Sequence, residues 1–222
     1  MISVELEITL RCNHACPSCS RHCNIFDYGP TDMSMLEIEK FVKEAQASKG
    51  VKILSVMGGE PTIHPRFVDI VELLHQDLVK PGVVGLLRIA TNGKKPLPRL
   101  SFKPATVVSL PSQKKHRYSF IAPQDSGQAT LNCRVPYTCG VALNKFGYSP
   151  CGAGGAVARL FGLGQFIRDR LPSSPEEFID YRNLLCTLCQ ASAMKPKMSH
   201  RDRTPSRSYL KILEKRGWLG RL

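Results

Sequence analysis

Residues 3–19 read SVELEITLRCNHACPSC, and this stretch decides the fold. Its first half alternates apolar residues at even positions with polar residues at odd positions, which predicts a β-strand over residues 3–10. Its second half carries Cys12, Cys16 and Cys19 in the spacing C-x3-C-x2-C. Three thiolates can bind three irons of a four-iron, four-sulfur cube and leave the fourth iron open for chemistry.

The bulk composition is that of a globular protein. The chain has 222 residues, of which 42% are hydrophobic and 22% charged, so it can bury a real core. No apolar run approaches the roughly 20 residues that span a bilayer, so we expect no membrane segment. Residues 1–7 have no basic region typical of a signal peptide, so we expect the protein in the cytoplasm.

The chain contains nine cysteines, and they are clustered. Thiols stay reduced in the cytoplasm, where disulfides are rare. An odd number of clustered cysteines in that compartment favours metal ligation over disulfides. The clusters consist of Cys12, Cys16, Cys19 and Cys23, then Cys133, Cys139 and Cys151, then Cys186 and Cys189.

Strands and helices alternate in the first half of the chain. This order predicts a parallel sheet built from right-handed crossovers, and four strands are too few for a closed barrel. We therefore expect an α/β fold, an open, partial parallel β/α barrel over residues 1–115. After the strand at 3–10, the expected elements are a helix over about 36–48, a strand over 51–57, a helix over 65–78, and strands over 83–90 and 105–110.

From about residue 111, Gly, Pro and Cys become frequent and the alternation stops. We expect a small cysteine-rich domain over residues 116–194. The pattern there predicts a hairpin over 140–151 that turns near residues 144–147, a Gly-rich helix over 153–162, and a helix from about 173 to 185.

The net charge is +13, and part of it lies at the end of the chain. Residues 195–222 carry nine Lys or Arg residues against Asp202 and Glu214. We expect a basic tail with a helix over about 206–216. The charge fits a solubilising tail, and it also fits contact with RNA or another polyanion.

The cysteine loop directly after the first strand resembles the radical S-adenosylmethionine (SAM) enzyme superfamily. The resemblance implies that SAM binds the open iron of a [4Fe-4S] cluster held by Cys12, Cys16 and Cys19. It also implies a reductant such as a flavodoxin or ferredoxin, and a 5′-deoxyadenosyl radical that abstracts a substrate hydrogen. Ser18 departs from the family, which usually has an aromatic residue before the third cysteine. The alternative is a structural zinc site completed by His14 or Cys23.

Two further sequences follow predicted strands, at the edge where open α/β sheets place their sites. Residues 58–61 read Gly-Gly-Glu-Pro and resemble the family motif that binds the SAM amino group. Glycines allow close backbone approach, and Glu60 with nearby carbonyls can accept from an ammonium. Thr91 and Asn92 resemble the polar strand end near the SAM ribose and carboxylate. Ser109, near the end of the fourth strand, is a further candidate.

The later cysteines resemble the auxiliary-cluster extension of SPASM and twitch radical SAM enzymes. The family places one ligand before a hairpin, one after it and a closing pair later, which implies a second [4Fe-4S] cluster. Cys133 and Cys139 compete for the first position, and the sequence does not choose between them. The others are Cys151, Cys186 and Cys189. A zinc site with two cysteine pairs is the alternative.

The sequence does not specify the substrate. We expect a peptide or a small molecule, with RNA or a nucleoside as the second choice because of the net charge. A zinc-stabilised nucleic-acid-binding module is the rival without catalysis, but it has no use for Gly-Gly-Glu-Pro. Cys23 fits a fourth thiol at the first cluster, a hydrogen donor or a buried apolar residue. Candidate substrate contacts are His116, Arg117, Gln124 and Asp125.

Overall fold

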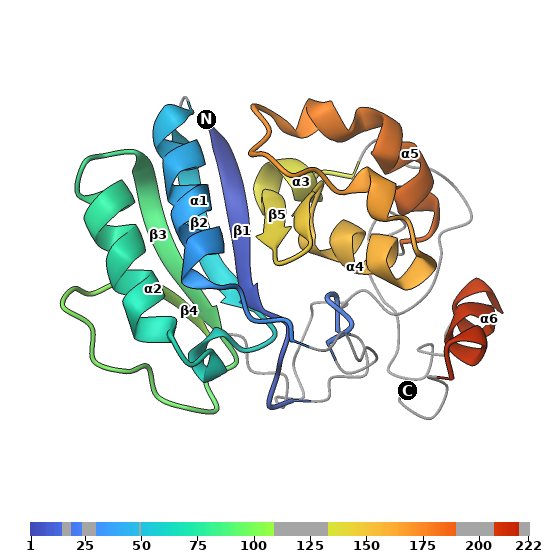
Figure 1. Cartoon of the computed structure of the whole chain (residues 1–222), viewed down its shortest axis with the longest axis horizontal. Coiled ribbons are helices and arrows are strands. Elements are labelled where there is room, and N and C mark those ends of the chain that lie inside the picture. The colour runs from blue at the N-terminus through green and yellow to red at the C-terminus, as the bar shows by residue number, and fades with distance from the viewer. Residues whose placement is uncertain (15–18, 24–29, 49, 109–132, 190–206, 218–222) are drawn as a thin grey trace.

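The computed structural model describes all residues except 15–18, 24–29, 49, 109–132, 190–206 and 218–222. Its centre is a six-stranded sheet with the order β4-β3-β2-β1-β5-β6 (Figure 1). All neighbours are parallel except β5 and β6, which form an antiparallel hairpin. Within the described residues the sheet ends at β4 and β6 and does not close, so the predicted open α/β architecture is confirmed.

The strands and helices follow the predicted order. The strands are β1 Ile2–Thr9, β2 Val51–Gly58, β3 Val84–Thr91, β4 Ala105–Val108, β5 Val141–Asn144 and β6 Gly147–Ser149. The α-helices are α1 Met35–Ala47, α2 Phe67–Leu74, α3 Val135–Thr138, α4 Gly152–Phe161, α5 Ile179–Thr187 and α6 Arg207–Lys215. Shorter turns of 3-10 helix are Pro61–Ile63, Gly164–Phe166 and Pro175–Phe178, and a π-helical turn spans His75–Val79.

Strand β1 is the central element, because it pairs with β2 on one side and β5 on the other. Its apolar side chains Val4, Leu6 and Ile8 are fully buried in the main core, which includes residues of α1 and α2. Alternation in a strand puts its odd residues on the opposite face. Glu5 and Glu7 on that face are also buried, so β1 has one apolar and one polar buried face.

Helix α1 begins with a capping box formed by Ser34 and Glu37. The Ser34 hydroxyl accepts from the Glu37 backbone N–H at 3.3 Å, and the Glu37 carboxylate accepts from the Ser34 backbone N–H at 2.6 Å. This reciprocal capping box satisfies donors that a helix start leaves unpaired. Asp32, two residues before Ser34, accepts from the Thr9 hydroxyl at 2.6 Å and forms an ion pair with Arg11. Asp32 therefore fixes the segment before α1 to the end of β1.

The structure departs from the expected elements in three places. The predicted helix over 65–78 begins at Phe67 and ends in the π-helical turn His75–Val79. The short helix α3 was not predicted, because its four residues are too few to show a helical pattern in the sequence. The predicted hairpin turns at Lys145 and Phe146 as expected, but β5 pairs with β1 and so continues the main sheet. The domain boundaries at residues 115 and 194 stay predictions.

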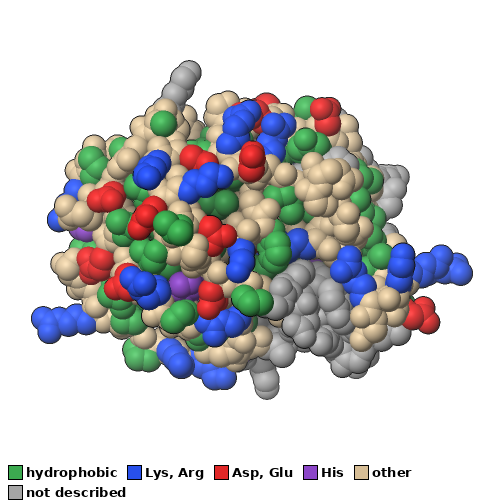
Figure 2. Space-filling view, in the orientation of Figure 1, with side chains coloured by type: hydrophobic (Ala, Val, Ile, Leu, Met, Phe, Trp, Pro, Cys, Tyr) green, Lys and Arg blue, Asp and Glu red, His purple; other side chains and the backbone are tan. Residues whose placement is uncertain are grey.

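The basic end of the chain is partly integrated into the fold. Helix α6 buries Tyr209 and Leu213 against Leu160 of α4, and the Tyr209 hydroxyl donates to the Leu188 carbonyl at 2.6 Å. Figure 2 shows acidic and basic side chains intermixed over α1 and α2, and basic side chains at the edge where α6 lies. No helix in the described part of the chain has the length and apolar character that crossing a bilayer requires.

Candidate active site

The first cysteine group lies where β1 ends. Cys12 and Cys19 are half-buried and close enough to influence each other electrostatically, while Cys16 lies outside the described residues. Cys23 donates a hydrogen bond to Cys19, which lowers the pKa of the Cys19 thiol to about 6. Burial raises the pKa of Cys12. The thiolate is the form of cysteine that binds metals.

The Gly-Gly-Glu-Pro loop packs directly on the chain that follows β1. The Gly59 N–H donates to the Thr9 carbonyl at 2.8 Å, and the Glu60 N–H donates to the Arg11 carbonyl at 2.9 Å. A Cβ at Gly59 would lie 2.1 Å from the Arg11 carbonyl oxygen, and one at Gly58 would lie 2.0 Å from that of Thr9. Both glycines are therefore required by the approach of the two strand ends, a reason that the sequence did not reveal.

The Glu60 carboxylate connects this loop to the end of β3. It is 1% exposed and accepts from the Thr62 N–H at 3.1 Å and the Thr62 hydroxyl at 2.6 Å. It also accepts from the Thr91 hydroxyl at 2.8 Å and from the Asn92 N–H at 2.7 Å. The hydrogen-bond donors to the Glu60 carboxylate thus come from two loops. Pro61, the next residue, is buried at the start of the 3-10 turn.

Asn92 completes the connection to the cysteine loop. Its side-chain amide donates to the Asn13 side-chain oxygen at 2.7 Å and lies 4.0 Å from the Cys12 sulfur. Its own oxygen accepts from the Lys94 N–H at 2.9 Å. The structure therefore brings together Cys12, Glu60 and Asn92, which follow three different parallel strands. Ser109 lies outside the described residues, as do His116, Arg117, Gln124 and Asp125.

Four of the later cysteines converge on a second place. They line one small, mostly apolar cavity together with residues that include Pro136, Pro150 and Arg182; the four are Cys133, Cys151, Cys186 and Cys189. Cys151 caps α4, and its sulfur accepts from the Gly154 N–H at 3.3 Å. Burial raises the pKa of Cys151 well above its ordinary value.

Cys139 does not line this cavity. It is half-buried at the end of α3, and burial followed by the charge of Glu5 raises its pKa. The side chain thus belongs to the polar face of the sheet rather than to the four-cysteine group. Of the two cysteines between which the sequence left the choice open, the structure places Cys133, and not Cys139, at this cavity.

A buried ion-pair network, which was not predicted from the sequence, lies between the two cysteine groups. Arg21, two residues after Cys19, contacts Glu5 at 2.8 Å and Glu7 at 3.0 Å. Glu7 accepts from the Asn144 amide at 2.8 Å, and Glu5 accepts from the Gly152 N–H at 3.4 Å. The sequence feature that could have revealed this network is the pair of carboxylates in a strand that has a neighbouring strand on each side. Carboxylates buried in this way need buried partners.

Replacing Arg21 with methionine is expected to lower the free energy of unfolding by about 3–5 kcal/mol, because it leaves Glu5 and Glu7 without their cation. Arg66 provides the control, since its ion pair with Asp69 is about half exposed, with 56% and 52% exposed side chains. The same substitution there should cost less than about 1 kcal/mol. Anaerobic denaturant unfolding of the iron-loaded protein measures the free energy of unfolding of both variants. Equal losses of free energy in the two variants would contradict the role of Arg21 as the buried cation.

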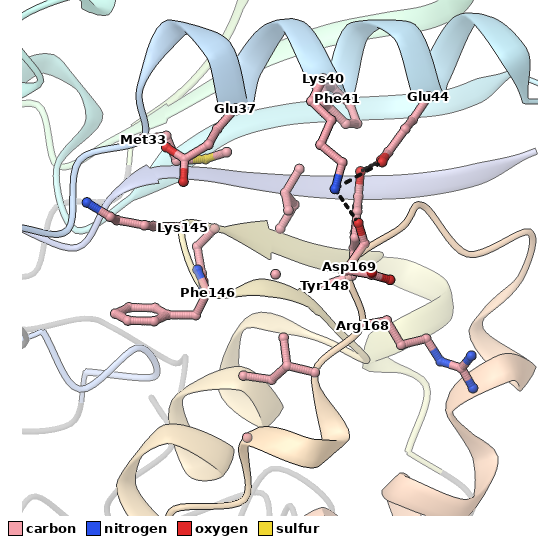
Figure 3. Close-up of a pocket in the computed structure, with 15 residues that line it drawn as sticks. Met33, Glu37, Lys40, Phe41, Glu44, Lys145, Phe146, Tyr148, Arg168 and Asp169 are labelled. Atoms are coloured by element: carbon pink, nitrogen blue, oxygen red, sulfur yellow. Dashed lines mark hydrogen bonds and ion pairs between the residues drawn. The ribbon is translucent and has the colours of Figure 1, made fainter.

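A cavity of about 280 Å³ lies on the other face of the sheet, between α1 and the hairpin (Figure 3). Lys40 and Glu44 of α1 line it, and Lys40 donates to the Asp169 carbonyl at 2.6 Å. Phe146 and Lys145 form its opposite wall at the hairpin turn. None of the predicted site residues that the structure describes lines this cavity.

Comparisons with known proteins agree with this geometry. The model of the radical SAM superfamily matches residues 6–100. The chain is 30% identical over 151 residues to a probable GTP 3′,8-cyclase of Thermococcus kodakarensis, which is 64% of this chain and 46% of that protein. It is 36% identical over 89 residues to a tungsten-containing aldehyde ferredoxin oxidoreductase cofactor-modifying protein of Pyrococcus furiosus, which is 40% of this chain and 23% of that protein. The chain thus spans less than half the length of these curated relatives.

A solved structure has a similar fold. The crystal structure of BtrN in complex with AdoMet and 2-DOIA superposes with a TM-score of 0.51, covering 85% of this chain and 88% of that chain at 13% identity. At this identity the likeness concerns the fold alone. The match to the superfamily begins within β1, includes Cys12, Cys19 and Glu60, and ends beyond β3. Residues 6–100 of this chain are therefore similar to the radical SAM superfamily.

Proposed function

We propose that the chain is a radical SAM enzyme that reductively cleaves SAM and abstracts a hydrogen from a peptide or small-molecule substrate. Cys12, Cys16 and Cys19 would hold the [4Fe-4S] cluster, reduced by a flavodoxin or ferredoxin. When bound, the cluster supplies one electron that breaks the C5′–S bond of SAM and gives the 5′-deoxyadenosyl radical.

One observation carries this proposal: the three loops of the predicted site are joined by hydrogen bonds at one edge of the sheet. Glu60 accepts from Thr91 and Asn92, and Asn92 donates to Asn13 beside Cys12. A structural metal site has no need for such a connection between a cysteine loop and two further strand ends. A site that holds a ligand against an open metal position does, because the ligand must be oriented at several points.

The residues at this edge have distinct proposed roles. The Glu60 carboxylate already accepts from Thr62, Thr91 and Asn92, so we assign it to ordering the loops. The SAM amino group is then assigned to the backbone of residues 58–60, whose path the two glycines permit. Asn92 lies against the Cys12 sulfur and would orient that ligand from outside the first coordination sphere.

The four converging cysteines support a second, auxiliary [4Fe-4S] cluster held by Cys133, Cys151, Cys186 and Cys189. Among the described residues, no three His, Cys, Asp or Glu side chains are grouped closely enough to bind a single metal ion. The support for a cluster is that all four cysteines line one cavity. Iron and zinc analysis distinguishes a cluster from the zinc alternative.

The position of the basic tail bears on the substrate. Helix α6 packs its apolar side on α4, and Tyr209 bonds to the Leu188 carbonyl next to Cys189. This packing gives the helix a structural task close to the second cysteine group, which weakens the case for an RNA-binding arm. We therefore keep a peptide or small molecule as the proposed substrate class.

The test is anaerobic purification followed by iron, sulfide and zinc analysis, and then incubation with SAM and dithionite. The proposal predicts about eight irons per chain, for two four-iron cubes, and release of 5′-deoxyadenosine. Stoichiometric zinc in colourless protein would contradict the whole proposal. About four irons with release of 5′-deoxyadenosine would contradict only the auxiliary cluster.

A further inference from the structure

Arg182 is a buried guanidinium in the wall of the four-cysteine cavity. It is 1% exposed, and it lies on α5 one turn before Cys186. Residues four apart in a helix share a face, so the arginine and the cysteine point to the same side. The mechanism proposed above gives no task to this side chain. Burying an arginine costs free energy unless its charge has partners, so its position calls for an explanation.

The contacts of Arg182 are directed at the cysteine group. One guanidinium nitrogen donates to the Cys133 carbonyl at 3.0 Å, and another donates to the Tyr137 hydroxyl at 3.0 Å. The side chain also donates a hydrogen bond to the Cys186 thiol, and its guanidinium carbon lies 5.3 Å from the centre of the Tyr137 ring. Arg182 thus contacts two of the four cysteines that line the cavity.

The nearby carboxylate of Glu176 does not account for this placement. Hydrogen bonds from Ser174 are the main reason why the pKa of Glu176 is lowered, and the charge of Arg182 is the smallest of the influences that lower it. Glu176 is also exposed, and water screens its charge. The positive charge of Arg182 therefore acts mainly on the cavity side.

A four-iron cluster with four thiolate ligands carries a net negative charge, which grows by one on reduction. A buried cation and hydrogen bonds to the cluster sulfurs both favour the reduced state, and both raise the reduction potential. We infer that Arg182 is a positioning residue that raises the reduction potential of the auxiliary cluster and makes it a better electron acceptor. This inference rests on the proposed second cluster.

The test is a redox titration of the iron-loaded enzyme followed by electron paramagnetic resonance, with and without SAM. The auxiliary signal is the one that SAM does not change, because all four irons of that cluster have protein ligands. Arg182→Gln should shift its one-electron reduction equilibrium about tenfold toward the oxidised form, which is about 59 mV for one electron. Arg182→Lys keeps the charge and should retain most of the wild-type potential.

Arg168→Gln is the control, because Arg168 lies over Phe178 and Tyr181 and does not line the cavity. It should leave the auxiliary potential unchanged. An unchanged potential in Arg182→Gln with full iron would overturn the inference, and so would loss of the auxiliary cluster in both Arg182 variants, since that would make the role structural. If the wild type holds about four irons and shows only the SAM-sensitive signal, the second cluster itself is wrong, while the SAM-cleaving function stands.

Discussion

Replacing Cys12 with alanine is expected to abolish the release of 5′-deoxyadenosine from SAM under reducing conditions. Cys12 follows β1 and lies against Asn92, which Glu60 and Asn13 hold in place. Removing a residue that supports a metal ligand typically lowers metal affinity or activity by about 10–100-fold. Removing the ligand itself should lower activity by more than that. We therefore expect a loss of more than about 100-fold, together with a fall of about four irons per chain.

Cys23 is the matched control for this experiment. It lies beside Cys19 and donates a hydrogen bond to it, but it falls outside the C-x3-C-x2-C spacing. Cys23→Ala removes a supporting hydrogen bond and not a ligand, so it should keep the full iron content and lower SAM cleavage by no more than about 10–100-fold. If Cys23→Ala lost the cluster as completely as Cys12→Ala, Cys23 would be a fourth ligand, and no iron would be open for SAM. Anaerobic chromatography of the reaction mixture and iron analysis distinguish these outcomes.

Local patterns predicted the elements that position the first site. The alternation along residues 3–10, the helical pattern over about 36–48 and the placement of each special loop after a strand all depend on neighbours in sequence. The same patterns contain no information about which strands pair over long distances. The parallel pairing of β5 with β1 joins residues 141–143 to residues 4–6, so the hairpin extends the sheet that the sequence assigned only to the first half.

The polar face of β1 shows why part of the site was missed. Glu5 and Glu7 fit the solvent face of an ordinary alternating strand, and only the burial of both faces makes them informative. Because both carboxylates are buried, they need the positive charge of Arg21 in the cysteine loop. Glu5 also accepts from the Gly152 N–H, so the network connects the cysteine loop to the start of α4. A Cβ at Gly152 would lie 2.6 Å from a Glu7 oxygen and 2.7 Å from an Arg21 nitrogen. The need for glycine there depends on the fold.

Replacing Cys133 with alanine is expected to remove the auxiliary cluster, whereas replacing Cys139 with alanine is expected to leave it intact. The two cysteines lie close in sequence, at opposite ends of α3. Cys133 lines the cavity with Cys151, Cys186 and Cys189, and Arg182 holds the Cys133 carbonyl at 3.0 Å. Cys139 instead lies near Glu5 on the polar face of the sheet.

Iron analysis and electron paramagnetic resonance of the two variants measure this difference. Cys133→Ala should contain about four irons per chain and show only the signal that SAM changes, while Cys139→Ala should contain about eight. Loss of iron in Cys139→Ala alone would reverse the assignment, and loss in both would mean a different ligand set. Because the first cluster depends on another loop, Cys133→Ala should still release 5′-deoxyadenosine. An auxiliary cluster needed only after hydrogen abstraction would then leave SAM cleavage intact while formation of the final product fails.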